Sequence, residues 1–211
     1  MPEPKARTFL TTEEKARIEQ AVRQVEATTS GEIVPLIVDA SYDYPRSELI
    51  GAGCFATALA ALLCWLAASD SVLVFVPLQL VLFLLFRMLI RVLPALKRRL
   101  IPQAEIDAEV EERAITAFVE HGLHETRDRT GILILISLFE RRVFVLADRG
   151  INDKVPQGTW DEVVAMITEG LRQGSACDSI CNAIARCGEL LAKDFPRRAD
   201  DTDELPNLII D

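Results

Sequence analysis

His121 and His124, the two histidines of the chain, stand three residues apart and are flanked by glutamates. Two imidazoles and a carboxylate on one helical turn could begin a zinc site. Such a site takes three or four ligands, however, and neither a third histidine nor a paired cysteine accompanies them. We therefore interpret His121 and Gly122 as the end of a helix, where a partly positive imidazole suits the helix dipole.

The five cysteines divide into two groups. Cys54 and Cys64 lie in an apolar stretch, and Cys177, Cys181 and Cys187 follow one another in a late helical segment. An odd number of cysteines without a CxxC pair is typical of neither a secreted disulfide framework nor a redox centre. We expect the late three to be small hydrophobic core residues, in a protein that faces a reducing compartment.

Motifs for nucleophilic catalysis and for phosphate binding are missing from the sequence. It has neither a GxSxG elbow nor a Walker A loop. Ser30-Gly31 and Thr130-Gly131 each precede an expected strand and not a helix, so a phosphate cradle is unsupported. The catalytic residues, if the protein has any, stay unknown at this point.

The charge balance argues against one class of partner. The chain has 211 residues, with 32 Asp and Glu against 23 Lys and Arg, and a net charge of -9. A nucleic-acid-binding protein needs clustered excess Lys and Arg to neutralise phosphates. We therefore expect no nucleic acid as partner. The mean hydropathy is nevertheless positive, +0.21, so the apolar residues must be concentrated in part of the chain.

Two apolar runs, Leu49–Ala68 and Val72–Leu89, account for this concentration. The first has no charged residue and the second has only Arg87, and each is long enough to cross a bilayer at about 20 residues per helix. The linker, Ser69–Ser71, is too short for a domain. The sequence thus predicts a transmembrane helical hairpin. A hairpin buried in a soluble core is the alternative, but both runs are apolar on every face and the chain is short.

Basic residues flank the hairpin on its open side. The positive-inside rule then predicts that both ends of the hairpin face the cytoplasm. We expect a protein of the cell inner membrane with two spans, a cytoplasmic soluble domain and the lipid bilayer as partner. Arg46 precedes the first span, and Arg87, Arg91, Lys97, Arg98 and Arg99 lie at the end of the second or after it. The latter group could also bind anionic headgroups, although setting the topology is the simpler role.

The first span has a face of small residues. Such faces allow close packing of a second membrane helix. We expect either the second span or a membrane-protein partner to pack on this Gly/Ala face. Its residues are Gly51, Ala52, Gly53, Ala56, Ala60 and Ala61.

Around the hairpin, hydrophobic periodicity predicts an α/β domain. Thr11 and Glu14 form a capping-box pattern before the first helix, and Pro35 favours a sheet edge or an irregularity in the first strand. We expect a mixed sheet sandwiched between helices, with the hairpin inserted in a crossover. The expected helices are 12–28, 103–125, 158–172 and 176–194, and the expected strands are 32–38, 131–138 and 142–147, the last two being antiparallel. The domains are then 1–48 with 95–211, the hairpin 49–94, and an acidic tail, 197–211, that lies loosely over the surface.

Three segments carry a resemblance to a known family: Thr29–Glu32, Thr130–Leu133 and Ala147–Ile151. Together they resemble the TPM-domain family, and the chain looks like its bacterial membrane subgroup, which carries a two-helix transmembrane insertion after the first strand. The resemblance implies an α/β/α sandwich. Members of the family include proteins described as acid phosphatases and an ion-channel accessory subunit, so the resemblance does not settle the activity.

The resemblance also implies a possible metal site, because family members can bind divalent cations through acidic loops at one end of the sheet. Asp39 after the first strand and Asp148 after the third could match, with Asp43 and Asp153 nearby. Oxygen ligands of this kind suit Ca²⁺ or Mg²⁺. The alternative is that these aspartates simply end their strands.

Three functional hypotheses follow. The first is a non-catalytic binding or accessory module for a membrane partner, which the missing catalytic motifs and the small-residue face favour. The second is a metal-dependent, acid phosphatase-like hydrolase that uses Asp39 and Asp148. The third is a hairpin that only tethers a protein working elsewhere, in which case the two soluble pieces should function when joined by a short linker.

Overall fold

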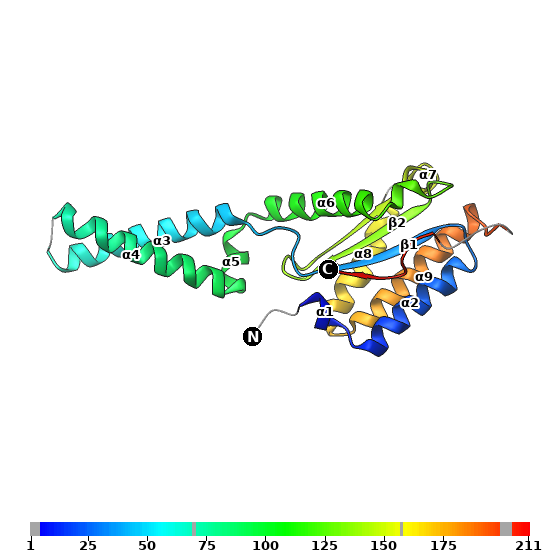
Figure 1. The fold of residues 1–211 in the computed structure, drawn as a ribbon, viewed down its shortest axis with the longest axis horizontal. Coiled ribbons are helices and arrows are strands. Elements are labelled where there is room, and N and C mark those ends of the chain that lie inside the picture. Colours follow the sequence, from blue (N-terminus) through cyan, green and yellow to red (C-terminus); the bar gives the residue numbers. More distant parts are fainter. Residues whose placement is uncertain (1–4, 69–70, 157, 199–203) are drawn as a thin grey trace. The chain divides into compact units, whose positions relative to one another are not determined.

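The computed structural model describes residues 5–68, 71–156, 158–198 and 204–211 (Figure 1). The chain forms two compact units. One comprises Met1–Ser41 with Asp107–Asp211 and is called the α/β unit below. The other, Tyr42–Ile106, is called the hairpin unit.

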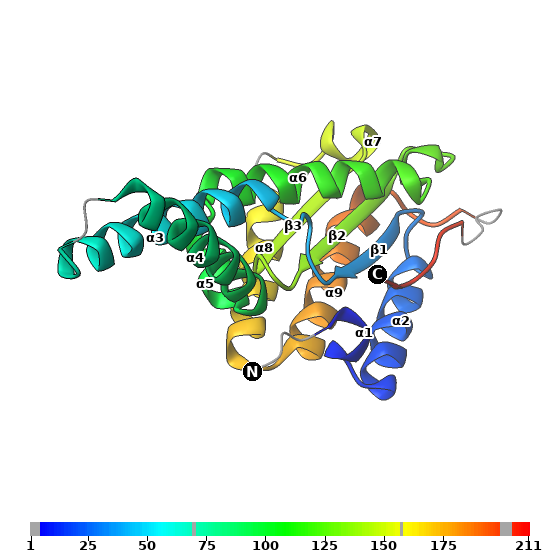
Figure 2. The ribbon, with the colours of Figure 1, turned by 60° about the vertical axis from the view of Figure 1, so that its left-hand side comes forward.

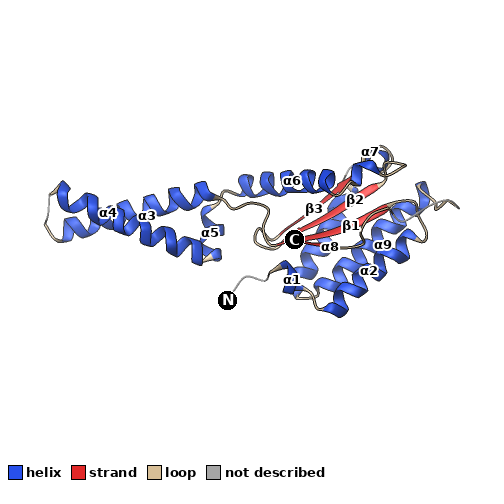
Figure 3. Cartoon of the chain, in the orientation of Figure 1, coloured by secondary structure: helices blue, strands red, loops and turns tan. Residues whose placement is uncertain are grey.

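The α/β unit is built on a four-stranded mixed sheet of order β3-β2-β1-β4. Figure 3 labels three of these strands, β1, β2 and β3. β1 (Glu32–Val38) runs parallel to β2 (Gly131–Ser137) and to β4 (Ile209–Ile210), whereas β3 (Arg142–Ala147) is antiparallel to β2. Every residue of β1 and β2 is buried. This is expected for strands that are apolar on both faces, because both faces of the sheet must then be covered.

Helices cover both faces (Figure 2). α2 (Thr12–Glu26), α8 (Thr159–Gln173) and α9 (Ala176–Asp194) lie on one face, and α6 (Gln103–Glu120) lies on the other. The predicted mixed sheet between helices is thereby confirmed. Short helices α1 (Ala6–Phe9) and α7 (Arg149–Asn152) and the 3₁₀ turn η1 (Leu123–Glu125) complete the unit.

The helix ends follow local chemistry. The predicted capping box of α2 is present: Glu14 N donates to Thr11 Oγ1 at 3.2 Å, and Thr11 N donates to Glu14 Oε2 at 2.8 Å. α6 is shorter than the expected 103–125. It ends at Glu120 because Gly122, with φ of 72°, takes the left-handed conformation that terminates helices.

Pro35 lies in a strand that is paired on both sides, yet it interrupts no observed pairing with β4. Asp211 N donates to Ile37 O, so the backbone groups of Ile37 point toward β4. Those of Pro35, two residues earlier, point the same way. β4 pairs only with Leu36 and Ile37, so the missing N–H of Pro35 falls beyond the short strand.

The acidic tail does not lie loosely over the surface where it is described. Ile209 and Ile210 form β4, and Arg113 Nη2 on α6 donates to Asp211 Oδ2 at 3.0 Å. The acidic composition of the tail predicts a loose segment. Its Leu208 and Ile210 nevertheless pack against the core, which fixes its end on the sheet.

The hairpin unit contains α3 (Pro45–Leu66), α4 (Val72–Val92) and α5 (Pro94–Leu100). The two long helices are long and apolar enough to cross a membrane, by length and composition. Gln79 Nε2 on α4 donates to Thr57 Oγ1 on α3 at 2.8 Å, so the helices lie side by side as a hairpin. Two residues of the predicted tip, Ser69 and Asp70, lie outside the described residues.

The small-residue face of α3 divides in the structure. Gly51, Ala52, Ala56 and Ala60 are buried within the chain. A Cβ on Gly51 would come within 2.7 Å of a Leu100 methyl group and 3.4 Å of an Ile90 methyl group, so α4 and α5 occupy this part of the face. A Cβ on Gly53 would meet no atom within 4 Å, and Ala61 is exposed. These two positions therefore lie outside the packed face.

Candidate binding site

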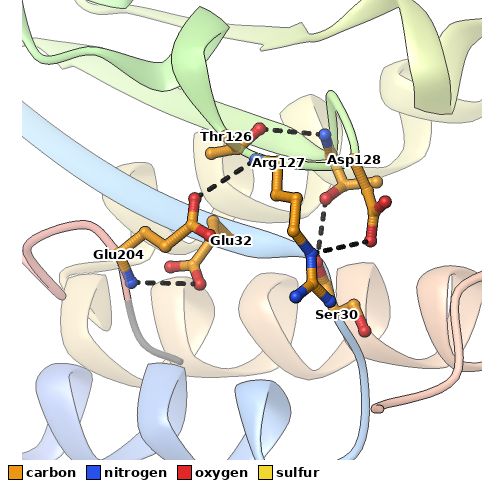
Figure 4. A pocket seen from close by; sticks show the side chains of 7 residues that line it. Ser30, Glu32, Thr126, Arg127, Asp128 and Glu204 are labelled. Carbon is orange, nitrogen blue, oxygen red and sulfur yellow. Dashed lines mark hydrogen bonds and ion pairs between the residues drawn. The ribbon is translucent and has the colours of Figure 1, made fainter. Parts of the chain in front are cut away.

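A shallow polar pocket lies at the end of the sheet where β1 and β2 begin (Figure 4). The start of β1, the loop before β2 and the C-terminal segment meet there. The pocket encloses about the space of one water molecule. Its lining residues are Ser30, Glu32, Thr126, Arg127, Asp128, Thr130 and Glu204.

The loop before β2 is held by its own threonines. Thr130 N donates to Thr126 Oγ1 at 3.1 Å, and Arg129 between them takes a φ of 57°. Thr130 Oγ1 donates to Ser30 O at 2.8 Å, which joins the loop to the start of β1. Local hydrogen bonds of this kind are typical of Ser and Thr in turns. They place the loop's charged side chains beside β1.

Two glutamates form a chain of contacts across the pocket. Glu204 N donates to Glu32 Oε1 at 3.4 Å, and Arg127 N donates to Glu204 Oε2 at 3.3 Å (Figure 4). Glu32 is buried. Because backbone amides donate to both carboxylates, the negative charge at this end of the sheet is partly balanced.

Asp128 is held by arginines. Arg198 Nη1 lies 3.0 Å from Asp128 Oδ2, and Arg127 Nε lies 3.9 Å from the same oxygen. A surface pair of this kind contributes little to stability. The pocket therefore presents carboxylates and guanidinium groups side by side.

Asp148 reaches the same end of the sheet, since its backbone N donates to Gly131 O at 2.9 Å. Its side chain caps α7 by accepting from Arg149 N, and a Cβ on Gly150 would come within 2.8 Å of Asp128 O. The other carboxylate oxygen, Oδ2, is buried and has no hydrogen-bond partner among the described residues. Asp148 therefore lies next to the loop before β2, outside the lining of the pocket.

Asp39 lies at the opposite end of the sheet. It follows the last residue of β1, whereas Asp148 lies beside the first residues of β1 and β2. Seven strand residues separate the two ends, a distance of about 20 Å. The reason is that β3 is antiparallel, so its carboxyl end points away from that of β1. The structure does not bring Asp39 and Asp148 together.

The remaining predicted ligands are also dispersed. Asp39 accepts a hydrogen bond from Ala6 N and so holds α1 at the end of β1. Asp153 pairs with Arg149 at 3.5 Å on the surface, and Asp43 belongs to the hairpin unit. Within the described ranges, no three His, Cys, Asp or Glu side chains are grouped so that they could hold a metal ion.

The histidines and cysteines have different surroundings. His124 Nε2 lies 3.6 Å from Glu125 Oε1, while His121 Nε2 and His124 Nδ1 are buried without a hydrogen bond to any described residue. Burial raises the pKa of the Cys177 thiol to about 11 and that of Cys187 to about 12. Neutral, buried thiols of this kind are poor nucleophiles, as expected for core residues.

Sequence reasoning missed the residues of the pocket, although part of the signal was present. Ser30 and Thr130 are polar residues just before the buried strands β1 and β2, Glu32 is the first residue of β1, and Asp128 lies three residues before β2. Parallel strands that begin side by side bring such residues together. Glu204 has no comparable signal, because its place depends on the return of the tail to β1.

The architecture is that of an α/β sandwich domain, with a mixed sheet and a polar pocket at one end. A family model described as the TPM domain matches residues 98–190, and the chain contains a TPM domain. The family resemblance of the sequence is thus confirmed, while the membrane subgroup stays a prediction.

Among solved structures, the chain is similar to the NMR structure of the BA42 protein from the psychrophilic bacterium Bizionia argentinensis. The two are 25% identical, with a TM-score of 0.59, and the match covers 96% of this chain and 94% of that chain. This similarity supports the α/β fold. A comparison with curated proteins gave no match.

Proposed function

We propose that the protein is a membrane-attached, non-catalytic binding module, in which the hairpin unit spans the cell inner membrane and the TPM domain binds a membrane partner. The observation that carries this proposal is the distribution of exposed apolar side chains. Apart from Ile115 and Val119, all exposed large hydrophobic residues within the described ranges lie between Tyr42 and Leu93. Trp65 is 76% exposed and Leu73 is 86% exposed.

An apolar surface of this extent is not stable in water, and it needs either a membrane or a protein to cover it. The helix lengths favour the membrane. α3 has 22 residues and α4 has 21, which at 1.5 Å per residue matches a hydrocarbon core of about 30 Å. The basic residues at the open end of the hairpin favour a cytoplasmic TPM domain.

The pocket supports binding more than catalysis. Its carboxylates already accept hydrogen bonds from backbone amides or arginines. Asp39 and Asp148, the residues of the hydrolase alternative, lie at opposite ends of the sheet. A partner that supplies its own charged groups could instead exchange with the Asp128–Arg198 pair.

Hydrolysis of a phosphomonoester tests the alternative directly. The full chain is purified in detergent and assayed with and without Mg²⁺ or Ca²⁺, beside Asp39→Asn and Asp148→Asn variants. We expect no turnover that depends on these residues. Metal-dependent turnover that is lost in either variant would establish a hydrolase and overturn the proposal.

The binding role is tested in membranes of cells that produce the protein. A photo-crosslinking amino acid is placed at Arg127 in the pocket loop or, as control, at Arg172 on α8. We expect a discrete membrane-protein adduct from position 127 and none from 172. Recovery of the protein in the soluble fraction, or identical adducts from both positions, would contradict the proposal.

A further inference from the structure

Exposed arginines gather at the open end of the hairpin unit. Arg46 is in the first turn of α3, Arg91 is in the last turn of α4, and Arg99 is in α5. All three are exposed, and none forms an ion pair with another described residue. Their guanidinium groups are therefore available to an external anion.

Two of these arginines lie at the same level along the hairpin. At 1.5 Å per residue, Arg46 lies about 30 Å from Leu66 at the far end of α3, and Arg91 lies about 29 Å from Val72 at the start of α4. The Thr57–Gln79 hydrogen bond shows that the helices are neighbours along their length. Since the hydrocarbon core is also about 30 Å thick, both arginines reach the headgroup layer of the same leaflet.

Arg99 is held near this level by a buried ion pair. Lys97 Nζ lies 2.8 Å from Glu48 Oε1, which fastens α5 to the first turn of α3. The pair also neutralises Glu48, the carboxylate closest to the arginines along α3. Arg99 follows Lys97 by two residues and is exposed.

The net charge is positive in the hairpin unit and negative in the rest of the chain. The hairpin unit has six Lys and Arg against four Asp and Glu, whereas the rest of the chain has 17 against 28. A negatively charged lipid surface would therefore attract the hairpin unit and repel the α/β unit. This distribution specifies which residues meet the lipid.

We propose that Arg46, Arg91 and Arg99 form a basic collar that binds the phosphate groups of anionic phospholipids at the open end of the hairpin. Guanidinium groups bind phosphate through paired, charge-assisted hydrogen bonds, and the collar presents three of them at headgroup depth. The inference rests on the membrane insertion proposed above, so insertion is measured separately.

The test uses the full chain in an uncharged detergent. Protein is equilibrated with equal amounts of phosphatidylglycerol and phosphatidylcholine and repurified, and the retained lipids are quantified by mass spectrometry. Wild type is compared with an Arg46→Gln/Arg91→Gln/Arg99→Gln variant. The control variant, Arg7→Gln/Arg149→Gln/Arg172→Gln, removes the same number of exposed charges from the α/β unit.

We expect wild type and control to retain phosphatidylglycerol in preference to phosphatidylcholine. In the collar variant, this preference should fall about fivefold for each arginine that is replaced. Equal preference in the collar variant and wild type would overturn the proposal, as would an equal loss in the control. Displacement of the lipid by an equal concentration of inorganic phosphate would also overturn it, because the collar would then bind free phosphate.

Insertion is followed through Trp65 in a Trp160→Phe background. In vesicles that contain lipids with brominated acyl chains, the bromine atoms quench the fluorescence of Trp65 when the hairpin is inserted. Quenching without a phosphatidylglycerol preference refutes the collar alone. Absence of quenching refutes the membrane insertion itself.

Discussion

Lys97 on α5 and Glu48 on α3 form an ion pair of 2.8 Å in which the side chains are only 15% and 8% exposed. The pair joins residues that are 49 positions apart, at the point where the hairpin returns toward the TPM domain. A buried charge pair is costly to form but much more costly to break, because a desolvated charge then loses its opposite charge. The base of the hairpin therefore depends on both residues.

Glu48→Ala should destabilise the hairpin unit strongly. Breaking a buried pair costs about 3–5 kcal/mol, whereas replacing both members by apolar groups is often neutral. We expect a lower thermal midpoint in detergent for Glu48→Ala, measured by circular dichroism, and recovery in a Glu48→Leu/Lys97→Met variant. A single variant as stable as wild type would show that the pair makes no net contribution.

Glu140, in the turn between β2 and β3, is a second buried carboxylate with a structural role. It accepts a hydrogen bond from Ser41 N at 3.0 Å and another from the hydroxyl of Ser137. Hydrogen bonds to charged groups contribute about 1.5–3 kcal/mol. Glu140→Ala should lower the free energy of unfolding by this order, as followed by Trp160 fluorescence in urea. Glu111→Ala, at an exposed position of α6, serves as control and should have little effect.

Some elements were predictable because their causes are local. The capping box at Thr11 and Glu14 specifies the start of α2 within four residues. The continuous apolar runs of β1 and β2 predict that both strands are buried on both faces. β4 was not predictable in this way. Two isoleucines at the end of an acidic tail become a strand only because the edge of β1 is present to pair with them.

The site illustrates the same limit. Asp148 and Asp39 each follow a strand, and strand order along the chain does not tell which end of the sheet each one reaches. The antiparallel β2–β3 turn does, and it places Asp148 with Asp128 and the pocket. Glu204 joins Glu32 across 172 positions, a contact that no local pattern encodes.

The contact between α2 and α9 requires a residue without a side chain. A Cβ on Gly188 would lie 2.6 Å from Val25 Cγ1, so Gly188→Ala must displace Val25 or separate the helices. Overpacking of this kind costs about 1–3 kcal/mol. We expect a lower urea midpoint, and a Gly188→Ala/Val25→Ala variant should lose less than the sum of the single changes. Gly53→Ala is the control, since its Cβ meets no atom within 4 Å; additive losses would refute the contact.

The buried thiol of Cys187 should make stability fall at high pH. Its pKa is raised by burial from 9.0 to about 12, so between these values the unfolded chain releases a proton that the folded chain keeps. The contribution of Cys187 is complete below pH 9 and is lost as the pH rises toward 12, with a slope of at most about 1.4 kcal/mol per pH unit. Urea unfolding at increasing pH should show this decline in wild type and a smaller one in Cys187→Ala, which removes the group.

Cys187→Ala also lowers stability at neutral pH, because a cavity replaces the sulfur, so the pH dependence and not the absolute value is compared. An identical decline in both proteins would assign the effect to other groups, such as Cys177, whose pKa burial raises to about 11.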